Sequence, residues 1–372
     1  MPTGFFRILT IGLSMTAILN TQAPAIVVRA FKPAVATAEE WQAYHEFCRV
    51  RALEDDPNWP TESDADRQRH ILQQWPLGEQ FRFIALIDDR IAGNLGISRR
   101  RAGTPDYDLH APFTWLWGGV RKDVRRQGVA TRLLCAAADF MTENRQTTAT
   151  ASTQFDDGRA FLGRIGAIEK LRVMENRLAT AAVDWDAMTA WEQSAQAVEP
   201  SLRWEVYDRR VPLDRYDALT PAMSKLFSDV PQGTLEQAPM QYNRASLETW
   251  YADIDVSGGN HFLVLLLRGD ELVAVCDAAW TAQFPDRAFQ NLTAVTRAWR
   301  GKGLAKAVKA RMMRQMRETQ ASIELIITTN ANVNASMLAI NRRLGFVQHK
   351  DVRTYQISVD RLRLAAADVR GG

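Results

Sequence analysis

The sequence predicts an α/β (α+β) protein made of two similar domains in tandem, each a mixed, mostly antiparallel sheet flanked by helices. The chain has 372 residues, enough for two domains of ordinary size. Apolar residues make up 46% of it and charged residues 24%, a composition typical of soluble globular proteins that excludes disorder and low complexity. In addition, one succession of strand, loop and helix occurs twice, 175 residues apart.

The repeat is clearest in a loop that opens a helix. Residues 125–130 have the sequence RRQGVA, and residues 300–305 have the sequence RGKGLA. Val120 and Val295 end the strand before each loop at the same offset. The helix that follows keeps the register, because each copy has four apolar residues spaced by four, which form one apolar face. These residues are Val129, Leu133, Ala137 and Met141 in the first copy and Leu304, Val308, Met312 and Met316 in the second.

The other elements follow in the same order in both copies. A strand and a helix come first, then a hairpin turning at Asp88-Asp89 or Gly269-Asp270, then the strand that enters the loop. After the helix come a strand, a short helix ending at Gly166 or Gly345, and a closing strand, 352–359 in the second copy. The alternation predicts strands at 26–31, 81–87, 91–97, 113–120, 149–153, 203–206, 261–267, 272–279, 289–295 and 323–328, and helices at 39–53 and 213–227.

The repeat also predicts the domain boundaries. We expect an N-terminal domain over 26–182, a linker rich in Ala and Gln over 183–200, a C-terminal domain over 201–365 and a tail over 366–372. Residues 1–25 are expected to be a leader or a disordered extension, because 8–19 are apolar and 23–25 resemble a small-residue cleavage site. An early start codon, with Met15 as the true start, is the alternative. The apolar run is too short for a transmembrane helix.

The repeated loop has the chemistry of an anion site. The first turn of a helix offers unpaired N–H groups and the positive end of the helix dipole. Glycine lets the backbone approach a phosphate closely, and an arginine adds a charge with bidentate geometry. The spacing is neither that of a Walker loop nor GxGxxG. The alternative is a glycine that serves only a tight turn, but two copies in register favour the anion site.

The strand, RxxGxA loop and helix, with the hairpin before them and the strand–helix–glycine after them, resemble the GNAT superfamily of acyl-CoA-dependent N-acyltransferases. The resemblance covers about 26–359 as two copies, in the tandem arrangement known from mycothiol synthase. It implies acetyl-CoA as co-substrate, its pyrophosphate on the loop amides and its pantetheine arm beside the preceding strand. The implied binding residues are Thr293, Val295, Arg300, Gly301, Lys302, Gly303, Leu304, Ala305, Asn330 and Asn334, and in the first copy Val120, Arg125, Arg126, Gln127, Gly128, Val129 and Ala130.

The two copies differ around the expected thioester. Many family members have a tyrosine that protonates the leaving thiolate where this chain has Asn341, whose amide can only hydrogen-bond the sulfur. The first copy has Phe155 and Leu162 at the positions of Asn334 and Asn341. We therefore expect a degenerate N-terminal domain, which either still binds CoA or has lost it, and a catalytic C-terminal domain.

The general base has no clear motif. Asp277, at the end of a strand, is one candidate, Glu324 and His261 are weaker ones, and a water relay would leave no trace in the sequence. Tyr355, on a closing strand, is a candidate proton donor to the thiolate. Each of these side chains could equally be structural.

The predicted function is acetyl transfer from acetyl-CoA to a primary amine of a small molecule by direct attack on the thioester. The alternatives are a non-catalytic or regulatory acyl-CoA-binding protein and an acyltransferase for protein N-termini or lysines. Cys48, Cys135 and Cys276 lack metal-ligand spacing, and the net charge of +3 is too small to indicate a nucleic-acid partner. We expect no metal, no membrane, a monomer or homodimer, and a cytoplasmic location, where acetyl-CoA is found.

Overall fold

The structure is a computed structural model that describes residues 25–73, 77–104, 107–238 and 243–370. The predicted leader lies outside these residues, except for residue 25. In the described part of the chain, no helix is both long and apolar enough to cross a bilayer. Nor do three or more His, Cys, Asp or Glu side chains of that part gather as metal ligands would.

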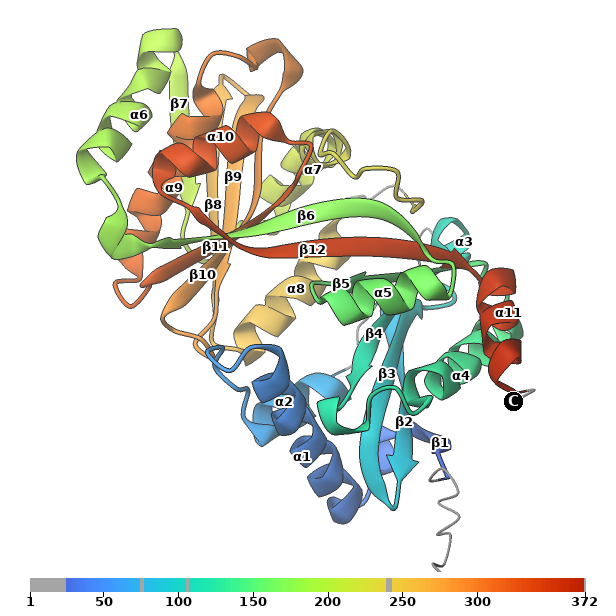
Figure 1. Cartoon of the computed structure of the whole chain (residues 1–372). Coiled ribbons are helices and arrows are strands. Elements are labelled where there is room, and N and C mark those ends of the chain that lie inside the picture. Colours follow the sequence, from blue (N-terminus) through green and yellow to red (C-terminus); the bar gives the residue numbers. More distant parts are fainter. Residues whose placement is uncertain (1–24, 74–76, 105–106, 239–242, 371–372) are drawn as a thin grey trace, which may run out of the picture.

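The strands form one mixed sheet of twelve, in the order β1-β2-β3-β4-β5-β12-β6-β11-β10-β9-β8-β7 (Figure 1). Among the strands of the described residues, the parallel pairs are β4 with β5 and β10 with β11, and the others are antiparallel. The prediction of two mixed, mostly antiparallel units is therefore confirmed, with the difference that their sheets join edge to edge.

The N-terminal half supplies the strands β1 (Val27–Phe31), β2 (Gly78–Ile87), β3 (Arg90–Arg100), β4 (Phe113–Val120), β5 (Thr148–Thr153) and β6 (Ile168–Ala179). Its helices are α1 (Ala38–Asp55), α2 (Asp64–Leu72), α3 (Tyr107–His110), α4 (Val129–Glu143) and α5 (Asp156–Arg164). The helix α1 begins with a capping box, in which Thr37 and Glu40 each accept from the other's backbone N–H.

The C-terminal half supplies β7 (Leu202–Tyr207), β8 (Asn260–Arg268), β9 (Glu271–Trp280), β10 (Arg287–Val295), β11 (Leu325–Ala331) and β12 (Val347–Ser358). Its helices are α6 (Trp185–Val198), α7 (Leu213–Ser228), α8 (Arg244–Val256), α9 (Leu304–Thr319), α10 (Ala335–Leu344) and α11 (Val359–Arg370). The sequence analysis did not predict α2 or α8.

The two halves exchange their closing strands, which corrects the predicted division of the chain at 182 and 201. The strand β12 pairs with β5 of the N-terminal half, and β6 pairs with β11 of the C-terminal half. Figure 1 shows β6 and β12 running side by side from one half to the other. Consequently Ile357 and Leu362 belong to the N-terminal core around α4, whereas Leu178 belongs to the C-terminal core around α9.

The segments expected to be a linker and a tail contain helices. The expected linker, 183–200, contains α6, which packs against α9 and buries Met188 and Ala195. Much of the expected tail belongs to α11, which packs on α4 and buries Ala366. Alanine-rich stretches favour helices, and here the small side chains permit close packing.

Helices cover both faces of each half of the sheet. The apolar faces predicted for α4 and α9 are confirmed, because all eight of their residues are buried in the two cores. On the other face, α1 packs over the N-terminal strands, and α7 and α8 pack over the C-terminal strands. In this arrangement each repeated loop lies at the end of the strand that precedes it, β4 or β10, and leads into the helix on one face of the sheet.

Candidate functional site

The two predicted loops share one backbone conformation. Gly128 and Gly303 immediately precede α4 and α9, with φ of 89° and 83°, a left-handed conformation that costs glycine little. Two residues earlier, Arg126 and Gly301 also have positive φ, 66° and 78°. Neither helix has a side-chain cap. Since the first-turn N–H groups of a helix have no partner within it, both loops present donors suited to an anion.

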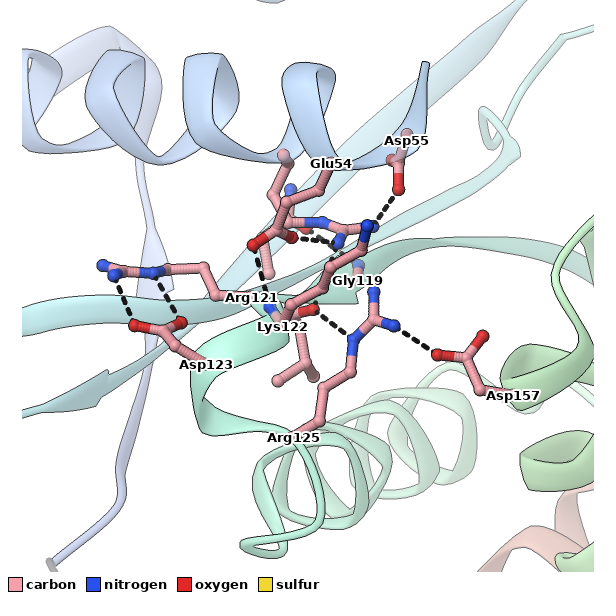
Figure 2. Close-up of polar contacts among 11 residues, drawn as sticks. Glu54, Asp55, Gly119, Arg121, Lys122, Asp123, Arg125 and Asp157 are labelled. Carbon is pink, nitrogen blue, oxygen red and sulfur yellow. Dashed lines mark hydrogen bonds and ion pairs between the residues drawn. The ribbon is translucent and has the colours of Figure 1, made fainter. Parts of the chain in front are cut away.

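The loop arginines hold the loop to the strand before it. Nε of Arg125 donates to the carbonyl oxygen of Val120 (3.2 Å), and its Nη1 donates to Asp157 of α5. Figure 2 shows the Arg125 guanidinium directed at Asp157. The sequence predicted Arg125 as a phosphate ligand, but these two partners give the side chain a structural role first.

A second arginine reaches the same strand end from α1. Nη1 of Arg51 donates to the Val120 carbonyl oxygen (3.2 Å), and the guanidinium forms ion pairs with Glu54 and Asp55, each at 2.6 Å. Glu54 also accepts from the backbone N–H of Lys122 (2.9 Å; Figure 2). Burial raises the pKa of the Asp55 carboxyl, against the opposing effect of Arg51.

The strands beside each loop separate. Pairing of β4 with β5 ends at Leu116, and pairing of β10 with β11 ends at Gln290. Residues 117–120 stay paired with β3 on their other side, so the backbone groups on the β5 side face the gap. Such an open strand edge can bind an extended amide-containing chain by main-chain hydrogen bonds.

In the N-terminal half, this gap contains a cavity of about 600 Å³, a volume typical of small-molecule sites. Of the residues predicted in the first copy, Val120, Arg125, Arg126, Gly128, Val129 and Ala130 line the cavity. Gln127 is exposed. The remaining wall is mostly apolar and includes Leu116, Leu133, Leu134, Phe155, Phe161, Leu162 and Ile165. The loop thus lies beside an apolar cleft, although the sequence predicted that this half is degenerate.

A second cavity, of about 510 Å³, adjoins the first. Both are lined by Arg51, Asn94, Trp117, Gly118 and Gly119, so they meet at the end of β4. The N–H of Gly119 donates to Oδ1 of Asn94 (3.1 Å). The second cavity extends from there towards the segment between α1 and α2 and the loop between β9 and β10.

In the C-terminal half, the predicted asparagines lie close together but are engaged with one another and with α10. Nδ2 of Asn341 donates to Oδ1 of Asn330 (2.6 Å), and Oδ1 of the buried Asn341 has no hydrogen-bond partner. Asn334 caps α10, because its Oδ1 accepts from the N–H of Met337 (3.3 Å). The oxygen expected near the pantetheine arm therefore serves the helix.

The C-terminal loop repeats the contacts of the first copy. Nε of Arg300 donates to the carbonyl oxygen of Val295 (3.0 Å), and Nη2 donates to Asp229 (2.7 Å). Lys302 lies with Nζ 4.6 Å from the ring centroid of Trp299. Thr293 contacts Cys276 (Oγ1 to Sγ, 3.3 Å), while Leu304 is buried and Ala305 is half-buried at the start of α9.

Asp277, the predicted base, belongs to a buried chain of hydrogen bonds. Nε2 of His261 is 2.8 Å from Oδ2 of Asp277, and Nδ1 is 2.9 Å from the hydroxyl of Tyr251. That hydroxyl also accepts from the N–H of Val211. An ionised Asp277 can only accept, so Nε2–H donates to it, and in a neutral imidazole Nδ1 then accepts from the hydroxyl. These partners lie towards α7 and α8, whereas Cys276, the next residue on β9, faces α9.

Tyr355, the predicted proton donor of the C-terminal site, lines the N-terminal cavity instead. The exchange of β12 places it opposite Ala151 of β5, and its hydroxyl donates to Glu169 of β6 (3.4 Å). Burial raises the pKa of Tyr355. The structure therefore does not bring Tyr355 together with Asp277 and Asn341, and its assignment to the C-terminal site was wrong.

The helices α4 and α9 differ in charge at one buried position. Leu134 lines the N-terminal cavity, and 175 residues later α9 has Lys309, whose Nζ donates to Gln290 and lies 5.2 Å from the ring centroid of Phe346. Nε2 of Gln290 donates to Sγ of Cys276 (3.3 Å). Burial lowers the pKa of Lys309 to about 8 and raises that of Cys276 to about 11.

The sequence analysis missed the residues of the second cavity. Arg51 and Asp55 lie near the end of a helix that contains many charged residues, and Asn94 lies within a hairpin strand. The sequence pattern distinguishes none of these three residues from its neighbours. The sequence did identify Val120 as the end of the strand before the loop, but it gave no sign that Arg51 reaches this residue.

Comparisons with known proteins agree with this architecture. The family model described as "Acetyltransferase (GNAT) family" matches residues 39–166 and 221–346. No match was found among curated protein sequences. Among solved structures, a tandem GNAT protein from the clavulanic acid biosynthesis pathway superposes with a TM-score of 0.69 at 17% identity, over 90% of this chain and 99% of that one.

Two further structures share the fold. A GCN5-related N-acetyltransferase from Sphaerobacter thermophilus matches with a TM-score of 0.60 at 15% identity, over 90% of this chain and 96% of that one. The glucosamine N-acetyltransferase region of a fungal β-N-acetylglucosaminidase matches with a TM-score of 0.61 at 13% identity, over 91% of this chain and 38% of that one. Since the family model covers more than half of the sequence in two copies, this chain is a tandem member of the GNAT acetyltransferase family.

Proposed function

We propose that this protein transfers an acetyl group from acetyl-CoA to a primary amine of a small molecule, and that the N-terminal cavity holds the acetyl-CoA. The single observation that carries the placement is the cavity of about 600 Å³ between β4 and β5, lined by the RxxGxA loop at one end. The sequence analysis expected the chemistry in the C-terminal half, so the proposal departs from it.

The fit of acetyl-CoA to this cavity rests on three features. The uncapped first turn of α4 offers N–H donors to the pyrophosphate, and Arg125 and Arg126 add positive charge beside it. The open edge before Val120, whose own carbonyl is engaged by Arg51 and Arg125, offers main-chain partners to the amides of the pantetheine arm. The apolar wall from α4 and α5 suits the methylene groups between those amides.

The acceptor amine would occupy the second cavity, which meets the first at Gly118 and Gly119. Its nitrogen, once deprotonated, attacks the thioester carbonyl carbon. The C–N bond forms, the C–S bond breaks, and CoA leaves as a thiolate with the electron pair. The nitrogen loses one further proton to a base or to water, and the thiolate takes one up. The balance needs no metal and no redox partner.

The C-terminal half supports this division of roles. Where Leu134 lines the N-terminal cavity, α9 buries the amine of Lys309 against Gln290. The oxygens of Asn334 and Asn330 are also engaged within the protein. We therefore propose that the C-terminal half is the structural partner that completes the N-terminal site.

A matched pair of variants tests the placement. Ala130 and Ala305 are the second residues of α4 and α9, and both are half-buried. A glutamate there suits the helix dipole, so Ala130→Glu and Ala305→Glu should both fold, but it repels a pyrophosphate at its own loop. We expect A130E to weaken CoA binding, measured by calorimetry, by about tenfold or more, and A305E to leave it within about twofold.

The same samples report turnover. Acetyl-CoA is supplied with a panel of primary amines, and release of the free thiol is followed with a thiol reagent. We expect transfer by the wild type and by A305E and its loss in A130E. A loss confined to A305E would move the site to the C-terminal half, and CoA binding without transfer to any amine would favour the regulatory acyl-CoA-binding alternative.

A further inference from the structure

The second cavity has walls from both halves of the chain. Trp59, Pro60, Thr61 and Glu62, between α1 and α2, line one part, and Gln283 and Phe284, between β9 and β10, line another. Nε2 of Gln283 donates to Oε1 of Glu62 (3.0 Å). The rings of Trp59 and Phe284 have centroids 6.3 Å apart. At this contact the C-terminal half therefore completes one wall of the cavity.

Glu62 is held so that one of its oxygens remains available. Oε1 is within hydrogen-bond distance of both Gln283 (3.0 Å) and Nδ1 of His70 (2.5 Å). Oε2 lies 3.8 Å from Nε of Arg67, beyond an ordinary hydrogen bond. Since an ionised carboxylate accepts about four hydrogen bonds, Oε2 retains acceptor capacity. Its partners therefore orient the carboxylate but leave Oε2 able to accept a further hydrogen bond.

The charges that line the cavity balance, because Asp55 and Glu62 are matched by Arg51 and Arg67, so a preference for a cation depends on the open oxygen of Glu62. Arg67 pairs more closely with Asp64 (2.9 Å) than with Glu62. On the other side, the guanidinium of Arg51 pairs with both Glu54 and Asp55, of which Asp55 lines the cavity. The aromatic side chains that line the cavity are Phe47, Trp59, Trp117 and Phe284. The guanidinium carbons of Arg287 and Arg177 already lie 4.4 and 4.9 Å from the ring centroid of Trp59, so the aromatic side chains suit a flat apolar group and leave the ammonium to Glu62.

We propose that the second cavity binds the acceptor as its ammonium ion, that Glu62 is the ammonium ligand, and that Gln283 positions Glu62 from the other half of the chain. The substrate class is a primary amine carried on an aromatic or similarly flat apolar body. This inference rests on the proposed function, because it concerns the second substrate of that reaction.

Three probes with the same body test the charge preference. The full chain is saturated with CoA and titrated calorimetrically with 2-phenylethylamine, 2-phenylethanol and 3-phenylpropanoate. We expect the amine to bind about tenfold more tightly than the alcohol or the carboxylate, because a charged hydrogen bond to Glu62 is made only by the ammonium. Weaker or equal binding of the amine, including no detectable binding, overturns the proposal.

Three variants locate the preference. Glu62→Gln should abolish the preference for the amine, because it should lower the affinity for the amine about tenfold and leave the affinity for the alcohol unchanged. Gln283→Leu should weaken binding of the amine about threefold or more, because Glu62 loses the partner that positions it. In the E62Q background, the same substitution should not change the affinity for the amine further. The control is Gln348→Leu, on an exposed part of β12, which should change neither. A preference that survives E62Q, or a Q283L effect that persists in E62Q, overturns the assignment.

The CoA titration of the same proteins separates this inference from the function it rests on. If wild type, E62Q and Q283L all bind CoA equally and the preference fails, the acceptor assignment is wrong and the acetyl-CoA site stands. If the wild type binds no CoA, the proposed function itself fails.

Discussion

Nε of Arg125 donates a hydrogen bond to the carbonyl oxygen of Val120, and 175 residues later Arg300 makes the same bond to Val295. In both copies another guanidinium nitrogen meets an aspartate, Asp157 or Asp229. The repeated arginine therefore closes the loop onto the strand that enters it. This contact sets the direction in which the first-turn amides of α4 and α9 point.

We predict that Arg125→Ala and Arg300→Ala both destabilise the fold, by about 1 kcal/mol, because the first leaves Asp157 without its cation and the second leaves the Val295 carbonyl without its donor. The Val120 carbonyl keeps Arg51 in the first variant, and Asp229 keeps Arg297 in the second. Only R125A should also weaken CoA binding, since it loosens the loop at the proposed site. Urea unfolding measures the first effect and calorimetry the second. Equal losses of CoA affinity in the two variants would show that both loops bind CoA.

The sequence predicted what is local. The loops, the apolar faces of α4 and α9 and most strands follow from short-range periodicity, and these predictions are confirmed. The exchange of β6 and β12 was not predictable, because an alternating strand has the same pattern whichever sheet it joins. For the same reason the sequence did not predict that Tyr355, on β12, lines the N-terminal cavity.

The second cavity was hidden for a related reason. Its cross-domain contact joins Glu62 to Gln283, which are 221 residues apart in the chain. Neither residue belongs to the repeated loop, and no spacing rule connects the α1–α2 segment to the β9–β10 loop. Only the assembled sheet brings these two loops to the same cavity.

Gly128 provides a test of the loop backbone. Its φ of 89° is left-handed, so Gly128→Ala should cost about 1–2 kcal/mol although a Cβ would have space there. The control is Gly163→Ala within α5, whose added Cβ meets nothing within 4 Å. Alanine is the better helix former, so G163A should raise stability by up to about 1 kcal/mol. Thermal unfolding of both variants measures the difference, and equal changes would contradict the strained-loop argument.

The exchanged C-terminal segment should support the N-terminal site. Leu362 of α11 is fully buried and lines the cavity between β4 and β5. We predict that Leu362→Ala costs roughly 2–5 kcal/mol and weakens CoA binding, because it leaves a hole in that wall. Leu364→Ala, two residues on and 58% exposed, should stay within about 0.5 kcal/mol and bind CoA normally. Normal CoA binding by a folded L362A variant would argue against acetyl-CoA in this cavity.

Lys309 should make stability depend on pH. Burial lowers its pKa from 10.5 to about 8, so the unfolded chain keeps this proton at pH values where the folded chain has lost it. Between about pH 8 and 10.5 the unfolded state therefore binds more protons, and stability rises with pH. Below pH 8 both states are protonated, and the full cost of burying the ammonium remains, on the order of 3 kcal/mol.

The difference in stability between the wild type and Lys309→Met isolates this effect. Tyrosines with raised pKa, such as Tyr207 at about 12, occur in both proteins and cancel. We expect the wild type to gain stability relative to K309M from pH 8 to 10.5 in urea unfolding. Gln315→Met, at another buried polar position of α9, should show a difference from wild type that does not vary with pH. A flat difference for K309M would mean that the amine is neutral at pH 7 or reaches water, and α9 would then carry no buried charge opposite Gln290.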